Sequence, residues 1–217
     1  MVTIYITSEE DDASEESGST KPKAKDAPPG KMMLHKDFVC HYSPFFNAAF
    51  NGKFKEGLTQ EMTLQADVTA FGIIAGWFYT RKILNADGEM PDAPTLARVW
   101  ILAERFLMPG LQDQVLDCIH NMRQTITSSD FLTFMEIADK HAGNDMCVES
   151  LLVWGVSSLY ECDYDGFALR TAHLPPRALL LLANFLKRNQ GEKAKLSAFG
   201  NGISDYYVSK KSDEVRA

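Results

Sequence analysis

The stretch that decides the fold reads Leu34-His35-Lys36-Asp37-Phe38-Val39-Cys40-His41-Tyr42-Ser43-Pro44-Phe45-Phe46. It continues a short apolar run, Met32-Met33-Leu34, and leads into aromatic residues that end at Phe50. Residues 43–50 are therefore expected to form a short helix with aromatic packing contacts. A brief strand is predicted just beyond it, over residues 61–64.

Another strand is predicted at the start of the chain. Residues 2–6, Val2-Thr3-Ile4-Tyr5-Ile6, are short, β-branched and aromatic, as is typical of a strand. Residues 7–30 hold Asp, Glu, Ser, Lys, Pro and Gly with almost nothing to bury, so they cannot offset their ordering entropy and are predicted to be disordered. This acidic insert has seven acidic residues and three lysines, and so carries −4 of the formal net charge of −7.

Helical patterns dominate after residue 66. Asp67 is placed to cap a helix with an apolar stripe of Phe71, Ile74 and Phe78, and the turn residues at 85–94 predict a loop. Beyond that loop apolar residues recur at i, i+3, i+4 and i+7, Pro109-Gly110 breaks the pattern, and Thr127-x-x-Asp130 resembles a capping box. The predicted helices cover residues 96–107, 111–122, 131–138, about 146–160, and a last segment that begins at Pro175-Pro176. The fold class is α+β, with a small sheet and a helical majority.

Composition and charge narrow the function classes. With 217 residues, 45% hydrophobic and 24% charged, the chain has ordinary globular composition. The acidic balance disfavours nucleic-acid binding, because reading a phosphate backbone requires a basic face. The apolar runs are far shorter than a membrane span, and the N-terminus does not resemble a signal peptide. We expect an intracellular protein, cytoplasmic, nuclear or both, with no membrane partner.

The sequence nominates no catalytic site. Its five histidines lack metal-ligand spacing, and its cysteines form no C-x-x-C pair and are expected to be small buried hydrophobes. Neither a G-x-S-x-G elbow nor a phosphate-binding glycine loop is present. We therefore predict no enzyme activity, no cofactor and no metal. The residues concerned are His35, His41, His120, His141, His173, Cys40, Cys118, Cys147 and Cys162.

The stretch from Leu34 to Phe46 resembles the signature of the BTB/POZ domain. In that family a strand ends in His-Lys or His-Arg, a hydrophobic pair follows, and Ser-x-aromatic-Phe opens a short helix. The chain is similar to the short BTB proteins of filamentous fungi, which often carry Ser-Pro-x-Phe and a Trp-x-Tyr-Thr helix end. The match continues through Ala48-Ala49-Phe50, Gly52-x-Phe54-x-Glu56, Leu64, Phe71, Trp77-Phe78-Tyr79-Thr80, Leu102-Ala103-Glu104-Arg105-Phe106-Leu107-Met108 and Leu111-Gln112.

The resemblance implies a small β-sheet flanked by a cluster of α-helices. The BTB/POZ domain would cover residues 1–126, a helical extension residues 127–199 and a polar tail residues 200–217. The first strand would pair with the strand before His35. The acidic insert would replace the usual tight hairpin turn, which is tolerable because loop closure costs only about 0.6 kcal/mol per doubling of length.

The resemblance also implies roles for individual residues. Its fold signature falls on His35, Lys36, Ser43, Phe46 and Tyr79. We expect His35 to pack and form hydrogen bonds within the fold rather than to act in catalysis. The aromatic residues expected in the core are Phe45, Phe46, Trp77 and Tyr79.

The implied function is non-catalytic protein–protein interaction, through self-association as a homodimer, recruitment of a protein partner, or both. Phe54-Lys55-Glu56 resembles the hydrophobic-x-Glu motif of BTB proteins that recruit cullin-type ubiquitin-ligase scaffolds. There the apolar side chain fills a groove on the cullin and the glutamate fixes orientation. The alternative function that this resemblance implies is a substrate adaptor of a cullin–RING ubiquitin ligase, with Phe54 and Glu56 on the cullin. The alternative is that Phe54 covers the core and Glu56 is solvated. Pro44 stands where zinc-finger BTB proteins carry Asp, which disfavours a corepressor groove.

Overall fold

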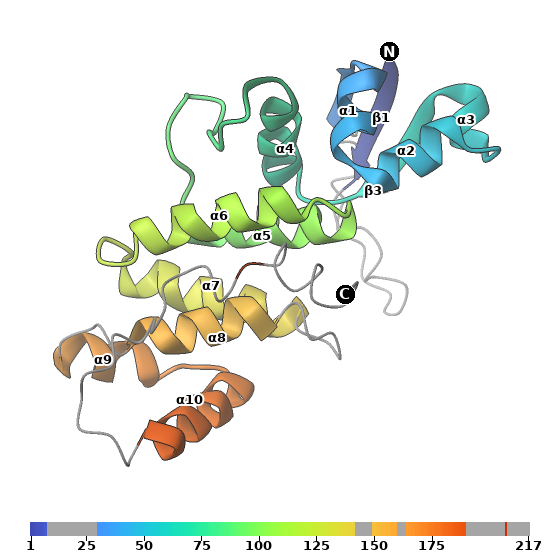
Figure 1. The fold of residues 1–217 in the computed structure, drawn as a ribbon. Coiled ribbons are helices and arrows are strands. Elements are labelled where there is room, and N and C mark those ends of the chain that lie inside the picture. Colours follow the sequence, from blue (N-terminus) through green and yellow to red (C-terminus); the bar gives the residue numbers. More distant parts are fainter. Residues whose placement is uncertain (8–29, 142–148, 160–163, 190–206, 208–217) are drawn as a thin grey trace, which may run out of the picture. The chain divides into compact units, whose positions relative to one another are not determined.

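The computed structural model describes residues 1–7, 30–141, 149–159, 164–189 and 207. The chain forms two compact units: the first is Met1–Met90 with Arg105–Met108, and the second is Pro91–Glu104 with Pro109–Ala217. Most of the acidic insert and of the polar tail lies outside the described residues, as do Cys147 and Cys162. Figure 1 shows the helices and strands of both units.

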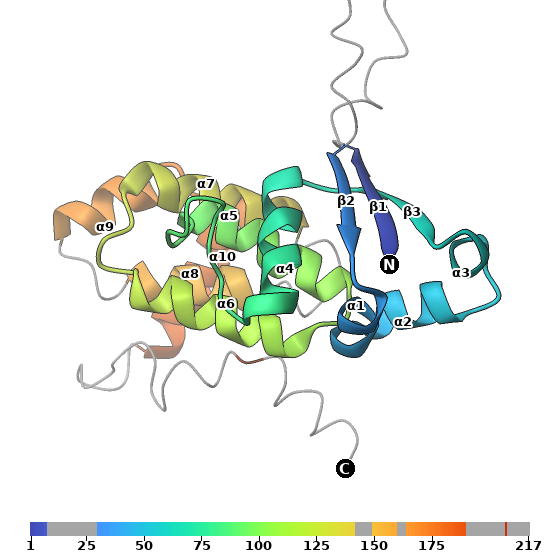
Figure 2. The same cartoon turned by 90° about the horizontal axis from the view of Figure 1, so that it is seen from above.

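The first unit contains a three-stranded sheet. Its strands are β1 (Val2–Thr7), β2 (Gly30–Leu34) and β3 (Glu61–Gln65), in the order β2-β1-β3. β1 pairs antiparallel with β2 and parallel with β3, so all three strands lie side by side (Figure 2). The expected pairing of the N-terminal strand with the strand before His35 is confirmed. The predicted insert was one residue too long at each end, because Thr7 and Gly30 belong to strands.

The first unit also contains four helices between residues 36 and 80. They are α1 (Lys36–Tyr42), α2 (Pro44–Asn51), α3 (Lys55–Thr59) and α4 (Val68–Thr80). The predicted cap of α4 is confirmed, since the Asp67 carboxylate accepts a hydrogen bond of 2.8 Å from the Ala70 N–H. α1 and α3 were not predicted, because helices of seven and five residues are too short to display a helical repeat.

The core of the first unit is built around aromatic rings. Phe46 and Phe106 lie with centroids 4.8 Å apart, and Phe71 meets Phe106 edge to face at 6.0 Å. Phe106 lies just after α5 (Ala93–Arg105). Most of α5 belongs to the second unit, but Arg105–Met108 belong to the first. The helix ends two residues before its predicted limit, because Leu107 adopts a left-handed conformation with φ 57° and Met108 precedes a proline.

The second unit consists of helices and the turns between them in the described residues. It comprises most of α5, then α6 (Pro109–Asn121), α7 (Ser128–His141), α8 (Glu149–Ser158), α9 (Tyr164–Thr171) and α10 (Pro176–Asn189). α5 begins inside the predicted loop at 85–94, because the Asp92 carboxylate caps it by accepting from the Thr95 N–H at 2.8 Å. No helix in the described ranges is long and apolar enough to cross a bilayer.

Helix packing in the second unit depends on a few close contacts. α8 packs against α7 and α10, and Trp154 meets Phe134 edge to face at 5.5 Å. The predicted cap at Thr127 is confirmed by a 3.1 Å hydrogen bond from the Asp130 N–H. α9 was not predicted, and its Arg170 donates to the Ile126 carbonyl at 2.8 Å, so it is held by tertiary contact as well as by local pattern.

Candidate protein-interaction site

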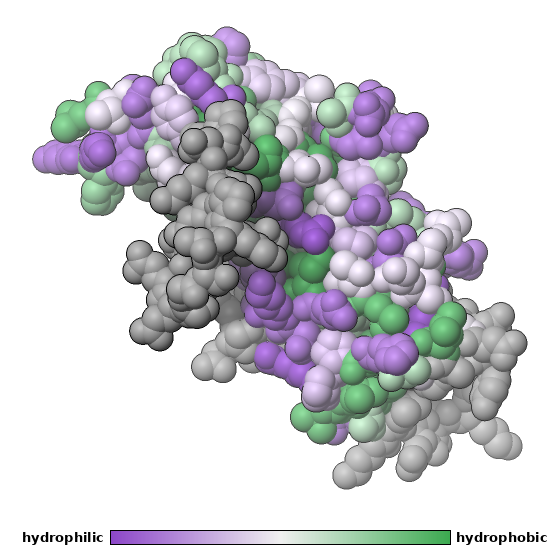
Figure 3. All heavy atoms as spheres, turned by 180° about the vertical axis from the view of Figure 1, so that it is seen from behind, coloured by the Kyte–Doolittle hydropathy of each residue, from purple (hydrophilic) through white to green (hydrophobic). Residues whose placement is uncertain are grey.

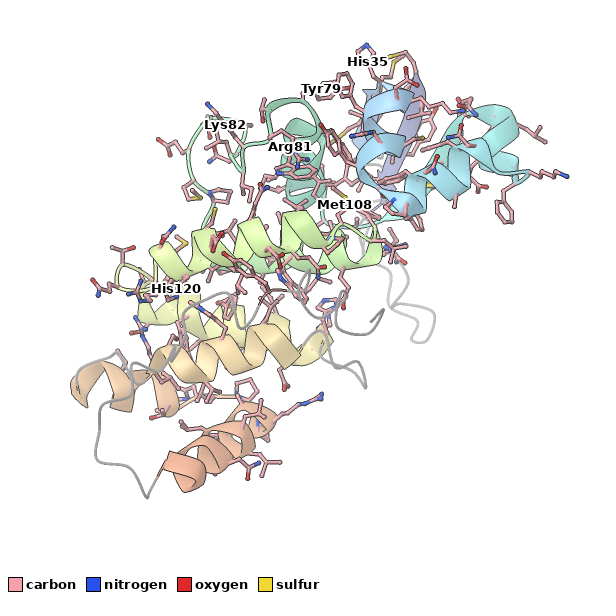
Figure 4. The ribbon with its side chains drawn as sticks, in the orientation of Figure 1. His35, Tyr79, Arg81, Lys82, Met108 and His120 are labelled. Atoms are coloured by element: carbon pink, nitrogen blue, oxygen red, sulfur yellow. The ribbon has the colours of Figure 1, made fainter. Side chains whose placement is uncertain are left out.

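The signature histidine lies between β2 and α1. The backbone N–H of His35 donates to the Tyr79 hydroxyl at 2.9 Å, and the imidazole Nδ1 lies 3.1 Å from the same oxygen. Both side chains are at the surface, as Figure 4 shows, and Tyr79 is 43% exposed. The hydrogen-bonding role expected of His35 is confirmed. The prediction that Tyr79 belongs to the core was wrong, because its hydroxyl bonds an exposed backbone group.

Lys36 closes the end of a neighbouring helix. Its Nζ donates to the Phe50 carbonyl at 2.9 Å, and the Gln60 amide donates to the same carbonyl at 3.2 Å. Carbonyls in the last turn of a helix lack partners within the helix, so these two donors satisfy the C-terminal end of α2. The family signature therefore holds α2 in place through side chains that come from α1 and from the residue before β3.

Ser43 holds the other end of α2. Its hydroxyl donates to the Phe106 carbonyl at 2.7 Å and accepts from the Phe46 N–H at 3.2 Å. Both Ser43 and Phe46 are fully buried. Phe46 and Trp77 thus have the core positions predicted for them, whereas Phe45 is only half-buried.

Two glycines allow α3 to fold tightly onto the end of α2. A Cβ on Gly57 would overlap the Gly52 carbonyl oxygen, and a Cβ on Gly52 would overlap the Ala48 carbonyl oxygen. Gln60 ends α3 in a left-handed conformation with φ 56°, and its amide also donates to the Gly57 carbonyl. The turn from α2 to β3 is therefore held by backbone contacts on one side and by Gln60 on the other.

This tight turn presents apolar side chains to solvent. Phe54 is 66% exposed and Leu58, one helical turn later, is 83% exposed. The alternative that Phe54 covers the core is therefore wrong. Glu56, which lies between Phe54 and Leu58 in the sequence, is half-buried. Lys53 and Lys55, the neighbours of Phe54 in the sequence, are exposed. We call Lys53, Phe54, Lys55, Glu56 and Leu58 the α3 surface.

Leu58 was missed at the level of sequence. No sequence signal marked it, because α3 is too short to display a helical repeat and Phe54 precedes the helix as its N-cap. Other large apolar side chains are also exposed, and on the face in Figure 3 hydrophobic side chains lie among hydrophilic ones. In the α3 surface the two apolar side chains stand on a backbone that Gly52, Gly57 and Gln60 hold in place.

A cation–π stack covers the end of α4. The Arg81 guanidinium lies 3.3 Å from the Trp77 ring centroid and 4.2 Å from that of Tyr42. Burial against these rings lowers the pKa of Arg81. Arg81 also has φ 58°, and its N–H donates to the Trp77 carbonyl, so the backbone brings the side chain back over Trp77. The stack explains how Trp77 is buried near a helix end.

The titratable groups offer no reactive centre in the part of the chain that the structure describes. Cys40 and Cys118 are half-buried rather than buried as predicted, and burial raises the pKa of both thiols, which keeps them protonated. Within the described ranges no three His, Cys, Asp or Glu side chains gather in a way that could hold a metal ion.

Comparison with known proteins places this geometry in a family. No curated protein is significantly similar to the chain. Residues 27–123 match the family model of the BTB/POZ domain, from just before β2 to just after α6. The α+β fold with its three-stranded sheet, and the signature residues around α1 and α2, agree with that match. Residues 27–123 of the chain form a BTB/POZ domain, and domains of that family are protein-interaction modules.

Proposed function

We propose that this protein is a non-catalytic interaction module that recruits a protein partner through the α3 surface. The observation that carries the proposal is the exposure of Phe54 and Leu58, 66% and 83%: Phe54 is the N-cap of α3, Leu58 lies within it, and Gly52, Gly57 and Gln60 hold this turn. Large aromatic side chains that become buried at the centre of an interface supply much of its binding energy.

The fixed turn increases the net free energy that these side chains can contribute to binding. Burying an exposed Phe or Leu side chain stabilises a complex by about 1.5–3 kcal/mol. Ordering a flexible loop would consume part of that gain. Because Gln60 and the two glycines already hold the turn, a partner gains the apolar contact with little loss of conformational entropy.

The partner we propose is a cullin-type ubiquitin-ligase scaffold. Phe54-Lys55-Glu56 resembles the hydrophobic-x-Glu motif, and the exposure of Phe54 supports its insertion into an apolar groove. The half-buried position of Glu56 near the start of α3 suits an orienting role. Exposed Lys53 and Lys55 favour a groove with an acidic rim, because complementary charges speed encounter and fix orientation.

Calorimetric titration with a cullin N-terminal domain tests this proposal. We expect binding by the native chain and a loss of roughly 10- to 100-fold in affinity for Phe54→Ala, from the area that a phenylalanine buries. Glu56→Ala, made alone, should also weaken binding. Met90→Ala is the matched control, since Met90 is 51% exposed in the same unit but outside the α3 surface. Equal binding by the native and Phe54→Ala chains would exclude the α3 surface.

Self-association is a second candidate, supported by a separate aromatic cluster. Phe38 is 44% exposed, and its ring lies 5.2 Å from Tyr79 and 6.0 Å from His35, centroid to centroid. Surface aromatic clusters of this kind are common in protein interfaces. Sedimentation equilibrium should show a dimer that Phe38→Ser dissociates and Phe54→Ala does not. A monomer at all accessible concentrations would reject this candidate.

A further inference from the structure

Tyr207, the described residue beyond residue 189, contacts α6. The Tyr207 hydroxyl donates a hydrogen bond to Oδ1 of Asp117, which lies on α6. Tyr207 is half-buried and lies 90 residues beyond its partner. Asp117 falls within residues 27–123, the part that matches the BTB/POZ model, whereas Tyr207 lies outside it. The contact thus joins Tyr207 to a helix of the BTB/POZ domain.

The surroundings of the hydroxyl favour a neutral group. Burial, the hydrogen bond to Asp117, and the negative charges of Asp117 and Asp113 raise the pKa of Tyr207 to about 12. Asp113 is itself buried, one helical turn before Asp117 on α6. A proton-bearing phenol therefore fits beside these two carboxylates, and a negatively charged group in its place would be repelled.

We propose that Tyr207 is a phosphorylation site and that its modification releases it from α6. In this step a protein kinase transfers the γ-phosphoryl group of ATP to Tyr207 Oη. The new Oη–P bond forms as the bond between the γ-phosphorus and its bridging oxygen breaks, ADP leaves, and the phenolic proton passes to a base of the kinase. Breaking the hydrogen bond between the Tyr207 hydroxyl and Asp117 has a modest free-energy cost, and it presents the hydroxyl to the kinase.

Phosphorylation reverses both features that favour the contact. The modified oxygen has no proton to donate to Asp117, and the phosphate adds about −1.5 to −2 charges at pH 7 beside Asp117 and Asp113. Like charges in direct contact repel strongly in partly buried surroundings. The modified residue therefore leaves α6, and the half-buried Asp117 carboxylate becomes more accessible to solvent and to partners of the BTB/POZ domain.

The first test places phosphotyrosine at position 207 of the full chain during synthesis and measures carbodiimide labelling of Asp117 by mass spectrometry. We expect labelling to become about five to ten times faster than in the unmodified chain, as loss of one hydrogen bond implies. Tyr207→Phe should give a smaller increase, because it loses the bond without adding charge. Asp87, exposed in the first unit, is the control carboxylate. Unchanged labelling of Asp117 would overturn the proposal.

The second test asks whether the contact controls access to the hydroxyl. The full chain and its Asp117→Ala variant are incubated with ATP and a broad-specificity tyrosine kinase. Tyr207 should be phosphorylated in both, and severalfold faster in the variant, while the rate at Tyr5 in the first unit stays the same. Equal rates at Tyr207 in the two chains, or no phosphorylation of Tyr207 in either, would contradict the proposal.

Discussion

Replacing Ser43 with alanine removes two buried hydrogen bonds with one oxygen atom. The hydroxyl caps α2 by accepting from the Phe46 N–H, and it donates to the Phe106 carbonyl at 2.7 Å. The cap is worth about 0.5–2 kcal/mol. The Phe106 carbonyl would lose this buried donor, at a cost of about 1–3 kcal/mol. Because the two effects share one atom and are not independent, we expect the first unit to lose about 2–4 kcal/mol of unfolding free energy.

Native-state hydrogen exchange measures this loss where it should occur. Amides of α4 report on opening of the first unit, and amides of α7 report on the second. Thr127→Ala is the matched control, since it removes a helix cap from an exposed residue of the second unit and should cost only about 0.5–1 kcal/mol. A loss below about 1 kcal/mol for Ser43→Ala would refute the reasoning that its second hydrogen bond is buried and costly to remove.

Three further predictions concern backbone fit, aromatic stacking and pH. Gly57→Ala should destabilise the first unit by about 1–3 kcal/mol, because the new Cβ would overlap a backbone carbonyl. Gly76→Ala should stabilise α4 by about 0.5–1 kcal/mol, because a Cβ there has no atom within 4 Å and alanine favours the helix. Urea unfolding of both variants measures these changes. Arg81→Ala should expose Trp77 to iodide quenching of its fluorescence, and unchanged quenching would show that the stack does not cover the ring. The contact of Tyr207 should be intact below pH 10 and lost as pH rises toward about 12, because its pKa is raised in the folded chain and the folded state then binds more protons than the unfolded state. Tyr207→Phe should abolish that part of the pH dependence of unfolding, and a variant with the native profile would contradict the assignment.

Local features of this fold were predictable because they depend on residues close in sequence. The caps at Asp67 and Thr127 each join a side chain to a backbone N–H three residues later, so the residue types predict the contact. The long helices show their repeat over several turns. The five- and seven-residue helices α3 and α1 do not, and their existence depends on the elements that hold them.

The stretch from Leu34 to Phe46 began the resemblance to the BTB/POZ domain, because it combines a strand end, two polar signature residues and a helix start in 13 residues. The α+β class followed from the order of predicted strands and helices along the chain. Tertiary structure alone decided which apolar side chains are covered. Tyr79 looks like a core residue in sequence and lies at the surface, and sequence left open whether Phe54 is exposed or covers the core, since burial depends on which other elements pack against a side chain. The contact between Tyr207 and Asp117 joins residues 90 apart, and no local pattern specifies such a pair. Residue type determines what a side chain can bond, and the packing of distant segments determines which partner it meets.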